Sequence, residues 1–224
     1  MTVAPSGDLV LVGAGGFGRE TAETVRAMNA CGASWRLLGY LDDDPELRGT
    51  RLGGIPVLGG VEELKRLPDA SVVVCTGRPD NYMSRPRIVA ALDLPSERYA
   101  TIVHPTAAVS TSSRIGPGSV LLAYVALTAD VTIGSHVAVM SHVSLTHDNI
   151  VEDFATLASG VRLSGRVRIG QRSWVGAGAL VREDRVIGAG ALVGLGSVVI
   201  DDVPACEVWA GVPARYLRAT EHSL

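Results

Sequence analysis

The chain is poor in the features that mark several large classes of protein. Its 224 residues include only three cysteines, and Cys31, Cys75 and Cys206 are too few and too widely spaced for a disulfide framework or a metal-ligand cluster. Their odd number favours a reducing compartment. With 20 basic and 23 acidic residues, a net charge of −3 and no long run of like charge, the sequence does not predict binding to nucleic acids or anionic membranes.

Long hydrophobic runs are also missing. The longest apolar run, 120–127, is much shorter than the ~20 residues that a membrane-spanning helix requires. The N-terminal stretch MTVAPSGD contains neither the basic nor the apolar region of a secretion signal. We therefore expect a soluble protein of the cytoplasm.

Aromatic residues make up only 4% of the chain, whereas there are 26 glycines and the remainder is rich in Val, Leu and Ala. Such a composition indicates a repeat built from small and aliphatic residues. An aliphatic residue does recur at every sixth position, without a gap, over the second half of the chain. These positions are Val103, Val109, Ile115, Leu121, Leu127, Ile133, Val139, Leu145, Val151, Leu157, Leu163, Ile169, Val175, Val181, Ile187, Val193 and Val199. If about one residue in three were aliphatic, chance would produce this run about once in 10⁸ trials, so the period is real.

Each six-residue unit has a second regular position. Four residues after the aliphatic, nearly every unit has a small or β-branched residue, and only Asn149 and Arg185 break this rule. Six residues are too few for a helical repeat, but they suffice for one short strand and a turn. Stacked units of this kind form a parallel β-helix with the recurring aliphatic residues in its core.

The first hundred residues have a different pattern. Apolar stretches at 9–12, 37–41 and 72–75 predict strands, and helical patterns occur after the first of these, at 61–67 and at 86–92. Strands that alternate with helices predict a small parallel α/β domain. We expect this domain to span 1–100 and the β-helix to span 101–206. A closing segment, 207–224, should end in a solvated tail from Tyr216 onwards.

A glycine motif follows the first predicted strand. Gly13-x-Gly15-x-x-Gly18 lies between a strand and a helix, where glycines allow a tight turn and the helix N-terminus can bind phosphate. Asp42 and Asp43, at the end of the second strand, can accept hydrogen bonds from a ribose or a base. The alternatives are a purely structural turn and an NAD-dependent reductase. A β-helical second half argues against a reductase, because it leaves no domain for hydride chemistry.

The repeat resembles the hexapeptide-repeat acyltransferases, whose left-handed β-helix of triangular section uses about eighteen residues per coil. With the glycine loop, the chain resembles the family of sialic acid O-acetyltransferases and UDP-4-amino-sugar N-acetyltransferases, which includes the perosamine N-acetyltransferases. The resemblance extends from the glycine loop to the closing segment Trp209-Ala-Gly-Val-Pro-Ala-Arg215. Its most specific section is 146–154, in which His147-Asp148 matches the catalytic pair of the family.

The residues themselves favour the same assignment. His147 follows the inward Leu145 by two positions and should project outward, and Asp148 can orient its ring or raise its basicity. Asn149 breaks the repeat beside this pair, as functional sites often do. A metal site is not expected, because the pair has no cysteine partner. Of the other histidines, His136 is expected in an exposed turn, and His142 is a candidate for the same cleft as His147.

The resemblance implies further site residues. Gly165, about one coil after His147, would offer its backbone N–H to the developing oxyanion. The implied contacts with the co-substrate acetyl-CoA are Thr156, Gly165, Ala177 and Leu195, and the implied contacts with a nucleotide-linked sugar are Gly15, Gly16, Phe17, Asp42, Asp43 and Gly77. The chain departs from the family at Thr156 and Phe17, where histidine is frequent, and at Glu152, where glycine is.

We therefore expect direct acetyl transfer from acetyl-CoA to the amino group of a nucleotide-linked amino sugar, with His147 as the general base. The resemblance also implies a homotrimer that binds acetyl-CoA between adjacent β-helices. The alternatives are O-acetylation of a sialic-acid-like sugar and a non-catalytic β-helix that binds nucleotide sugars. The glycine loop favours N-acetylation of a nucleotide-linked amino sugar over O-acetylation, because a free sugar would not need such a loop. The sequence does not identify the nucleotide base or the sugar.

Overall fold

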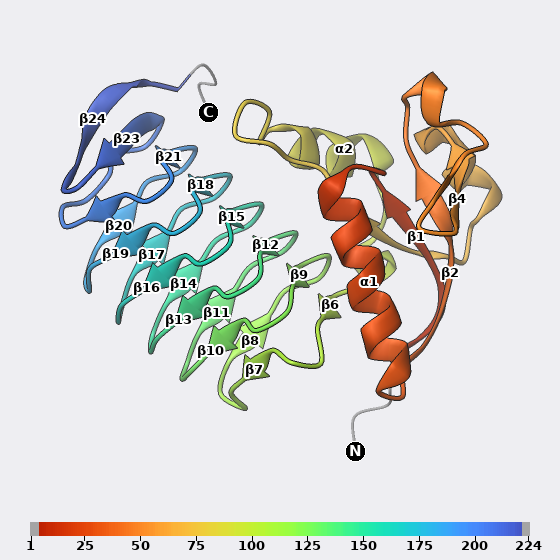
Figure 1. Cartoon of the computed structure of the whole chain (residues 1–224), viewed down its shortest axis with the longest axis horizontal. Helices are drawn as coiled ribbons and strands as arrows, with labels where there is room; N and C mark the ends of the chain where they lie inside the picture. The colour runs from red at the N-terminus through yellow and green to blue at the C-terminus, as the bar shows by residue number, and fades with distance from the viewer. Residues whose placement is uncertain (1–4, 221–224) are drawn as a thin grey trace.

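The structure is a computed structural model, and it describes residues 5–220. An α/β domain lies at one end of a long β-helix, and the chain passes once from the first to the second (Figure 1). The last strand of the domain, β5 (Ser71–Val74), and the first strand of the coils, β6 (Ile102–Val103), lie on either side of the boundary expected at residue 100.

The α/β domain is built on a five-stranded sheet with the strand order β3-β4-β2-β1-β5. Strands β1 (Ser6–Val12), β2 (Ser34–Leu41), β4 (Ile55–Gly59) and β5 are parallel, as expected, and β3 (Arg51–Leu52) is antiparallel to β4. The helices are α1 (Gly16–Ala30) and α2 (Ser84–Leu92), with short 3-10 helices η1 (Pro45–Leu47), η2 (Val61–Arg66) and η3 (Ser96–Arg98). The β3–β4 hairpin was not predicted.

Glycines shape the turn between β1 and α1. Gly13 has a φ of 104°, a backbone conformation that only glycine adopts readily. A side chain at Gly18 would collide with the carbonyl oxygen of Gly13, so the helix can approach the turn only because this residue is glycine. The motif therefore performs the structural part of the role predicted for it.

The second half of the chain is a parallel β-helix, as predicted. Its coils consist of two-residue strands, and each strand pairs with the strand one coil later, as Leu127 pairs with Leu145. The strands after β6 are β7 (Ala108–Val109), β8 (Arg114–Ile115), β9 (Val120–Leu121), β10 (Ala126–Leu127), β11 (Thr132–Ile133), β12 (Ala138–Val139), β13 (Ser144–Leu145), β14 (Ile150–Val151), β15 (Thr156–Leu157), β16 (Arg162–Leu163), β17 (Arg168–Ile169), β18 (Trp174–Val175), β19 (Leu180–Val181), β20 (Val186–Ile187), β21 (Leu192–Val193) and β22 (Val198–Val199).

The recurring aliphatic residues fill the core of the β-helix. From Leu121 to Val199, every sixth residue is at most 2% exposed, and burial of each such side chain contributes about 1.5–3 kcal/mol. From Leu121 to Val193, the third residue after each of them turns the chain with a positive φ, whether it is a glycine or not. These turns stack into three edges that separate the three sheets of the coil. The "site edge" holds residues 112, 130, 148, 166 and 184, the "covered edge" 118, 136, 154, 172 and 190, and the "third edge" 124, 142, 160, 178 and 196.

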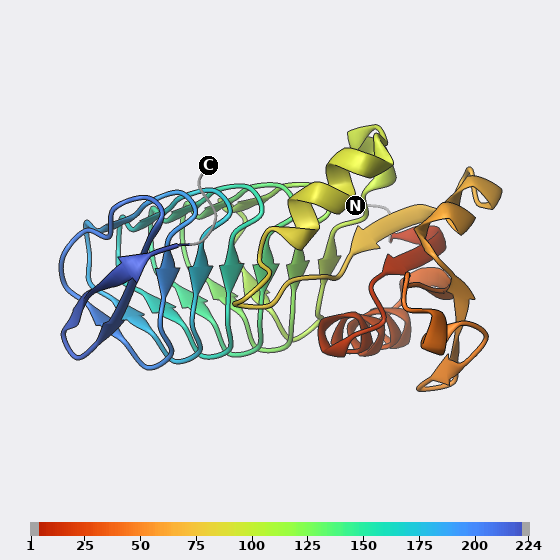
Figure 2. The ribbon, with the colours of Figure 1, turned by 90° about the horizontal axis from the view of Figure 1, so that it is seen from above.

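The α/β domain packs on one of the three sheets. This "covered sheet" runs in the order β24-β23-β21-β18-β15-β12-β9-β6, and its outward side chains Val120, Ala138, Thr156 and Trp174 are buried. The segment between β5 and α2 reaches along the coils (Figure 2), where the Tyr82 hydroxyl donates to the Gly190 carbonyl at 3.1 Å. Because the site edge lies between the other two sheets, it is on the opposite side of the coil from the α/β domain.

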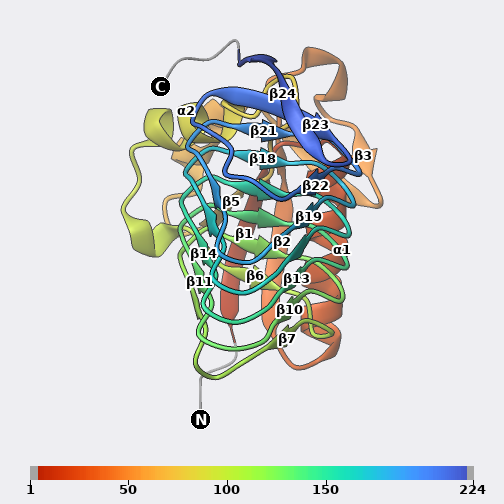
Figure 3. The same ribbon diagram turned by 90° about the vertical axis from the view of Figure 1, so that its left-hand side faces the viewer.

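The closing segment extends the covered sheet. β23 (Glu207–Gly211) pairs with β21, and β24 (Ala214–Ala219) pairs with β23 in the antiparallel direction (Figure 3). The stretch expected as a solvated tail is exposed from Tyr216 to Ala219, but its backbone is paired in a strand rather than free. The Thr220 N–H also donates to the Cys206 carbonyl at 2.8 Å. The rest of the expected tail, 221–224, lies outside the described residues.

Candidate active site

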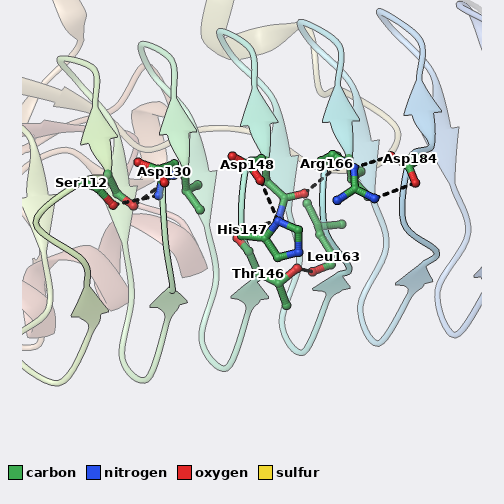
Figure 4. A network of polar contacts seen from close by, with 12 residues as sticks. Ser112, Asp130, Thr146, His147, Asp148, Leu163, Arg166 and Asp184 are labelled. Carbon is green, nitrogen blue, oxygen red and sulfur yellow. Dashed lines mark hydrogen bonds and ion pairs between the residues drawn. The ribbon is translucent and has the colours of Figure 1, made fainter.

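His147 and Asp148 form a hydrogen-bonded pair on the site edge, at the turn after β13. The side chain of His147 is 50% exposed, and its Nδ1 lies 2.7 Å from Oδ2 of Asp148 (Figure 4). A carboxylate at Nδ1 favours the tautomer that carries its proton there. The other ring nitrogen, Nε2, then has a free lone pair, which is what a general base requires.

The turn that carries the pair is fixed to both neighbouring coils. The Asp148 N–H donates to the Ala129 carbonyl, and the His147 carbonyl accepts from the Arg166 N–H, each at 3.0 Å. Inside the coil, the fully buried Asn149 donates to the Thr146 carbonyl and accepts from the Val167 N–H, also at 3.0 Å. Asn149 thus breaks the repeat because its amide clamps this turn from within.

Gly165 lies against the ring of His147. A methyl group at Gly165 would be 2.5 Å from Cε1 and Nε2 of His147, so any side chain here would displace the ring. Within residues 5–220, the Gly165 N–H donates no hydrogen bond. Glycine is therefore required at position 165 to leave room for the His147 ring, independently of any role of its N–H.

A second ion pair flanks the histidine on the same edge. Nε and Nη2 of Arg166 donate to the carboxylate of Asp184 at 2.6 and 2.9 Å (Figure 4). The hydrogen bond raises the pKa of Arg166 and lowers that of Asp184. Because Asp184 engages the Arg166 guanidinium, the Asp148 carboxylate is left to bond His147.

A cleft of about 500 Å³ lies in the α/β domain, at the carboxyl ends of its parallel strands. It brings together five of the expected substrate contacts, namely Gly15, Gly16, Phe17, Asp42 and Gly77. The N-terminus of α1 lines this cleft through Gly15, Gly16 and Phe17 and has no side-chain cap, which favours an anionic ligand such as a diphosphate.

The two aspartates of the predicted contact set differ. Asp42 lines the cleft, and its carboxylate also accepts hydrogen bonds from the N–H groups of Ala14 and Asp44, at 2.8 and 3.0 Å. Asp43 does not line the cleft, because its carboxylate turns away and accepts from the Val61 N–H at 2.8 Å.

Sequence reasoning missed the other lining residues, which follow β5. They are Cys75, Thr76, Arg78, Asn81 and Ser84, beside the predicted Gly77. Their place after a parallel strand could have indicated them, since ligands of such sheets bind beyond the carboxyl ends of the strands. Burial raises the pKa of Cys75 to about 12, so this residue lines the cleft as a neutral thiol.

The structure does not bring the expected acetyl-CoA contacts together in one chain. Gly165 is on the site edge, whereas Ala177 and the exposed Leu195 are beside turns of the third edge. Thr156 is elsewhere again: it is buried on the covered sheet, where its hydroxyl oxygen is 2.8 Å from Nη2 of Arg85. This hydroxyl is closed off from any ligand of the exposed edges.

The other histidines differ from the expectations. His136 is not in an exposed turn: it is 6% exposed, because the α/β domain packs on the covered edge. His142 lies on the third edge, stacked on Tyr124 with ring centroids 5.0 Å apart, and so does not share a cleft with His147 of its own chain. Between residues 5 and 220 no cluster of three or more His, Cys, Asp or Glu could hold a metal ion. Within the same range, no helix is long and apolar enough to cross a bilayer.

Comparison with known proteins finds relatives along nearly the whole chain. A family model described as the PglD N-terminal domain matches residues 8–90. GDP-perosamine N-acetyltransferase of Escherichia coli O157:H7 is 29% identical over 226 residues, which cover 96% of this chain and 98% of the relative.

Solved structures agree over the same length. PerB from Caulobacter crescentus, in complex with CoA and GDP-perosamine, has a TM-score of 0.82 and 30% identity, covering 94% of this chain and 97% of PerB. The acetyltransferase domain of PglB from Neisseria gonorrhoeae, in complex with acetyl coenzyme A, has a TM-score of 0.82 and 31% identity, covering 95% and 100%. The expected fold class, an α/β domain followed by a left-handed parallel β-helix, is confirmed.

Proposed function

The chain belongs to the family of acetyl-CoA-dependent sugar N-acetyltransferases that includes the perosamine and PglB enzymes, and from this premise we propose that it N-acetylates a nucleotide-linked amino sugar. The observation that carries the proposal is the His147-Asp148 pair, with Nδ1 bonded to the carboxylate and the ring exposed. The cleft at the start of α1 supports a nucleotide-linked acceptor over a free sugar.

The proposed reaction is a direct transfer. The amine nitrogen of the sugar attacks the thioester carbonyl carbon, and Nε2 of His147 takes the proton that the nitrogen loses. The tetrahedral intermediate then breaks its C–S bond, and the proton passes to the departing thiolate, which gives an amide and free CoA. We propose that the Gly165 N–H donates to the oxyanion of the intermediate and that Asp148 holds the ring of His147.

We propose that the working form is a homotrimer in which the site is shared between chains. His147 lies on the edge opposite the covered sheet, whereas the cleft lies on the side of that sheet, beside Trp174. A sugar held in the cleft therefore cannot reach His147 of the same chain. A closed ring would bring the cleft and third edge of one chain to His147 of the partner subunit, with acetyl-CoA in the groove between. Ala177 and Leu195 would then contact acetyl-CoA from one chain and Gly165 from the other.

The acceptor class is tested by the release of free thiol from acetyl-CoA. We expect release with amino-sugar nucleotides and much slower release with the same amino sugars lacking the nucleotide. Activity with a sialic-acid-like sugar alone would support O-acetylation instead, and no release with any acceptor would support a non-catalytic β-helix. We also propose a cytoplasmic location, which the free state of all three cysteines supports.

A further inference from the structure

Arg85 is a buried cation between the two parts of the molecule. It lies in the first turn of α2 and is only 2% exposed. Among residues 5–220, no carboxylate forms an ion pair with it. Burial lowers its pKa to about 10, so it stays protonated at neutral pH. Because a buried charge without a counter-ion is unfavourable, its presence requires strong compensating contacts.

Those contacts join the cleft to the β-helix. Nη1 donates to the Thr76 carbonyl at 3.1 Å, and Thr76 lines the cleft. Nη2 donates to the Phe154 carbonyl at 3.0 Å and to the Thr156 hydroxyl oxygen at 2.8 Å, and it lies 3.3 Å from the Ala155 carbonyl. The guanidinium therefore forms a bracket between the loop after β5 and the coil at β15.

This bracket lies directly behind one wall of the cleft. A methyl group at Gly77 would be 3.7 Å from Nη1 of Arg85 and 3.8 Å from the Trp174 ring. The Ser84 hydroxyl, next to Arg85 in the chain, donates to the Thr76 hydroxyl at 3.2 Å. The hydrogen bonds of Arg85 to Thr76, Phe154 and Thr156 thus set the position of this wall relative to the coils.

The coil to which Arg85 donates its hydrogen bonds also carries His147, the proposed general base. Phe154 and Thr156 follow His147 along the same turn of the β-helix. In a ring of parallel β-helices, symmetry puts His147 of the partner subunit at the same height. A bracket on this coil fixes the height at which the cleft presents its ligand to that histidine.

We propose that Arg85 is a positioning residue that holds the cleft for the nucleotide-linked sugar in register with the catalytic edge, and that Thr156 is its anchor rather than a contact of acetyl-CoA. This inference rests on the proposed function. It predicts a selective defect, because a cleft that shifts by about 1 Å misplaces the acceptor, which can reduce the rate by ~10²-fold, while the acetyl-CoA groove stays intact.

The experiment compares Arg85→Lys with Arg98→Lys. Arg98 is a matched control, because in the same domain it donates from Nε to the Ala70 carbonyl and from Nη2 to the Leu67 carbonyl, at 2.9 and 3.2 Å, away from the cleft. We expect Arg85→Lys to lower kcat/KM for the nucleotide-linked amino sugar by roughly 10–100-fold relative to Arg98→Lys. The KM for acetyl-CoA and the slow rate with the free amino sugar should not change.

Thr156→Val provides the second variant, since it keeps the shape of the side chain and removes only the oxygen. We expect a smaller loss of kcat/KM for the nucleotide-linked sugar, and little further loss when it is combined with Arg85→Lys. A raised KM for acetyl-CoA in Thr156→Val would overturn the anchor role. If Arg85→Lys does not fold, Thr156→Val still decides the question.

The outcomes separate this inference from the proposed function. Wild-type protein that acetylates no nucleotide-linked amino sugar contradicts the proposed function itself. An active wild type with an Arg85→Lys variant that keeps its activity contradicts the positioning role. Equal losses with the nucleotide-linked and the free amino sugar would also contradict it, because they would indicate general damage to the fold.

Discussion

Two edges of the same β-helix carry histidines with opposite surroundings. On the site edge, His147 is half exposed and bonds Asp148. On the covered edge, His136 stacks on Phe154 with centroids 5.0 Å apart, and it meets Tyr99 edge-on at 4.5 Å. The repeat provides both turns with nearly the same backbone, so the difference comes from the α/β domain that covers only one of them. What packs on an edge decides whether its histidine can react.

The electrostatics of the two edges differ in the same sense. Burial and, to a smaller extent, the positive charge of Arg85 lower the pKa of His136 to about 4, although Asp153 opposes the shift. Nδ1 of His136 is buried without a hydrogen-bond partner among the described residues. His136 is therefore a neutral packing residue at physiological pH. Because it is buried, it cannot contact a substrate as a general base must.

Removal of the exposed histidine should have the largest effect. We expect His147→Ala to reduce kcat by about 10²–10⁴-fold, the usual contribution of a general base, with the fold intact because the side chain is half exposed. Steady-state kinetics and thermal melting check both parts. His104→Ala, at the first coil, is the control and should keep full activity. A His147→Ala enzyme with more than about a tenth of wild-type kcat would exclude the general-base role.

The glycine under the ring allows a subtler change at the same edge. Gly165→Ala should push the His147 ring aside, because the new methyl group would be 2.5 Å from Nε2. A displacement of this size should reduce kcat by ~10²-fold with little change in the KM for the nucleotide-linked sugar. Ala129→Gly, two coils earlier at the equivalent position, is the control and should have wild-type kcat. Normal kinetics in Gly165→Ala would show that the ring need not stay where it lies.

On the covered edge, His136 should affect the pH dependence of stability rather than the reaction. The pKa of His136 in the folded state is below its unfolded value of about 6.5, so its contribution to stability is complete above that pH and is lost as the pH falls towards 4. Between pH 7.5 and 4.5 this loss is about 2 kcal/mol. His136→Phe should therefore be less acid-sensitive in urea unfolding than wild type. An unchanged pH dependence would contradict a buried, neutral His136, and His104→Phe is the control.

The smallest effect is expected inside the site edge. Asn149→Ser can keep an acceptor for the Val167 N–H, as Ser119 accepts from Val137 N at 2.9 Å, but it loses the hydrogen bond to Thr146. We expect a loss of about 1 kcal/mol in the free energy of unfolding. Kinetics should show a modest fall in kcat without a change in KM, since the turn that holds His147 is loosened. A stability equal to that of wild type would argue against the clamp.

The sequence predicted what depends on local periodicity. The period of six determined the coils, their core and the outward position of His147, because each unit pairs with its neighbours in a fixed register. What it could not predict is which sheet the α/β domain covers. The exposed turn expected for His136 was therefore wrong, and Thr156, expected to contact acetyl-CoA, is buried. The same turn or strand position is exposed on one side of the coil and buried on another.

Of two further features that the sequence analysis missed, only one had a signal in the sequence. The Gly53-Gly54 pair, directly before the apolar stretch 55–58, is typical of a β-hairpin turn and could have indicated β3 and β4. Arg85 had no such signal, because an arginine in the first turn of a helix is usually solvated. Its role depends on carbonyl groups that the fold brings to it from about seventy residues away.

The central claim is that the site combines His147 of one chain with the cleft of another. The most direct measurement is complementation between His147→Ala and Gly16→Leu. A Cβ atom at Gly16 would meet no atom within 4 Å, and Gly16 lines the cleft, so we expect the leucine side chain to obstruct ligand binding there. Each variant alone should be nearly inactive, and mixed oligomers of the two, isolated by two affinity tags, should recover part of the wild-type activity. Mixed oligomers without recovered activity, or full activity of wild type at the mass of one 23.3 kDa chain, would contradict the shared site.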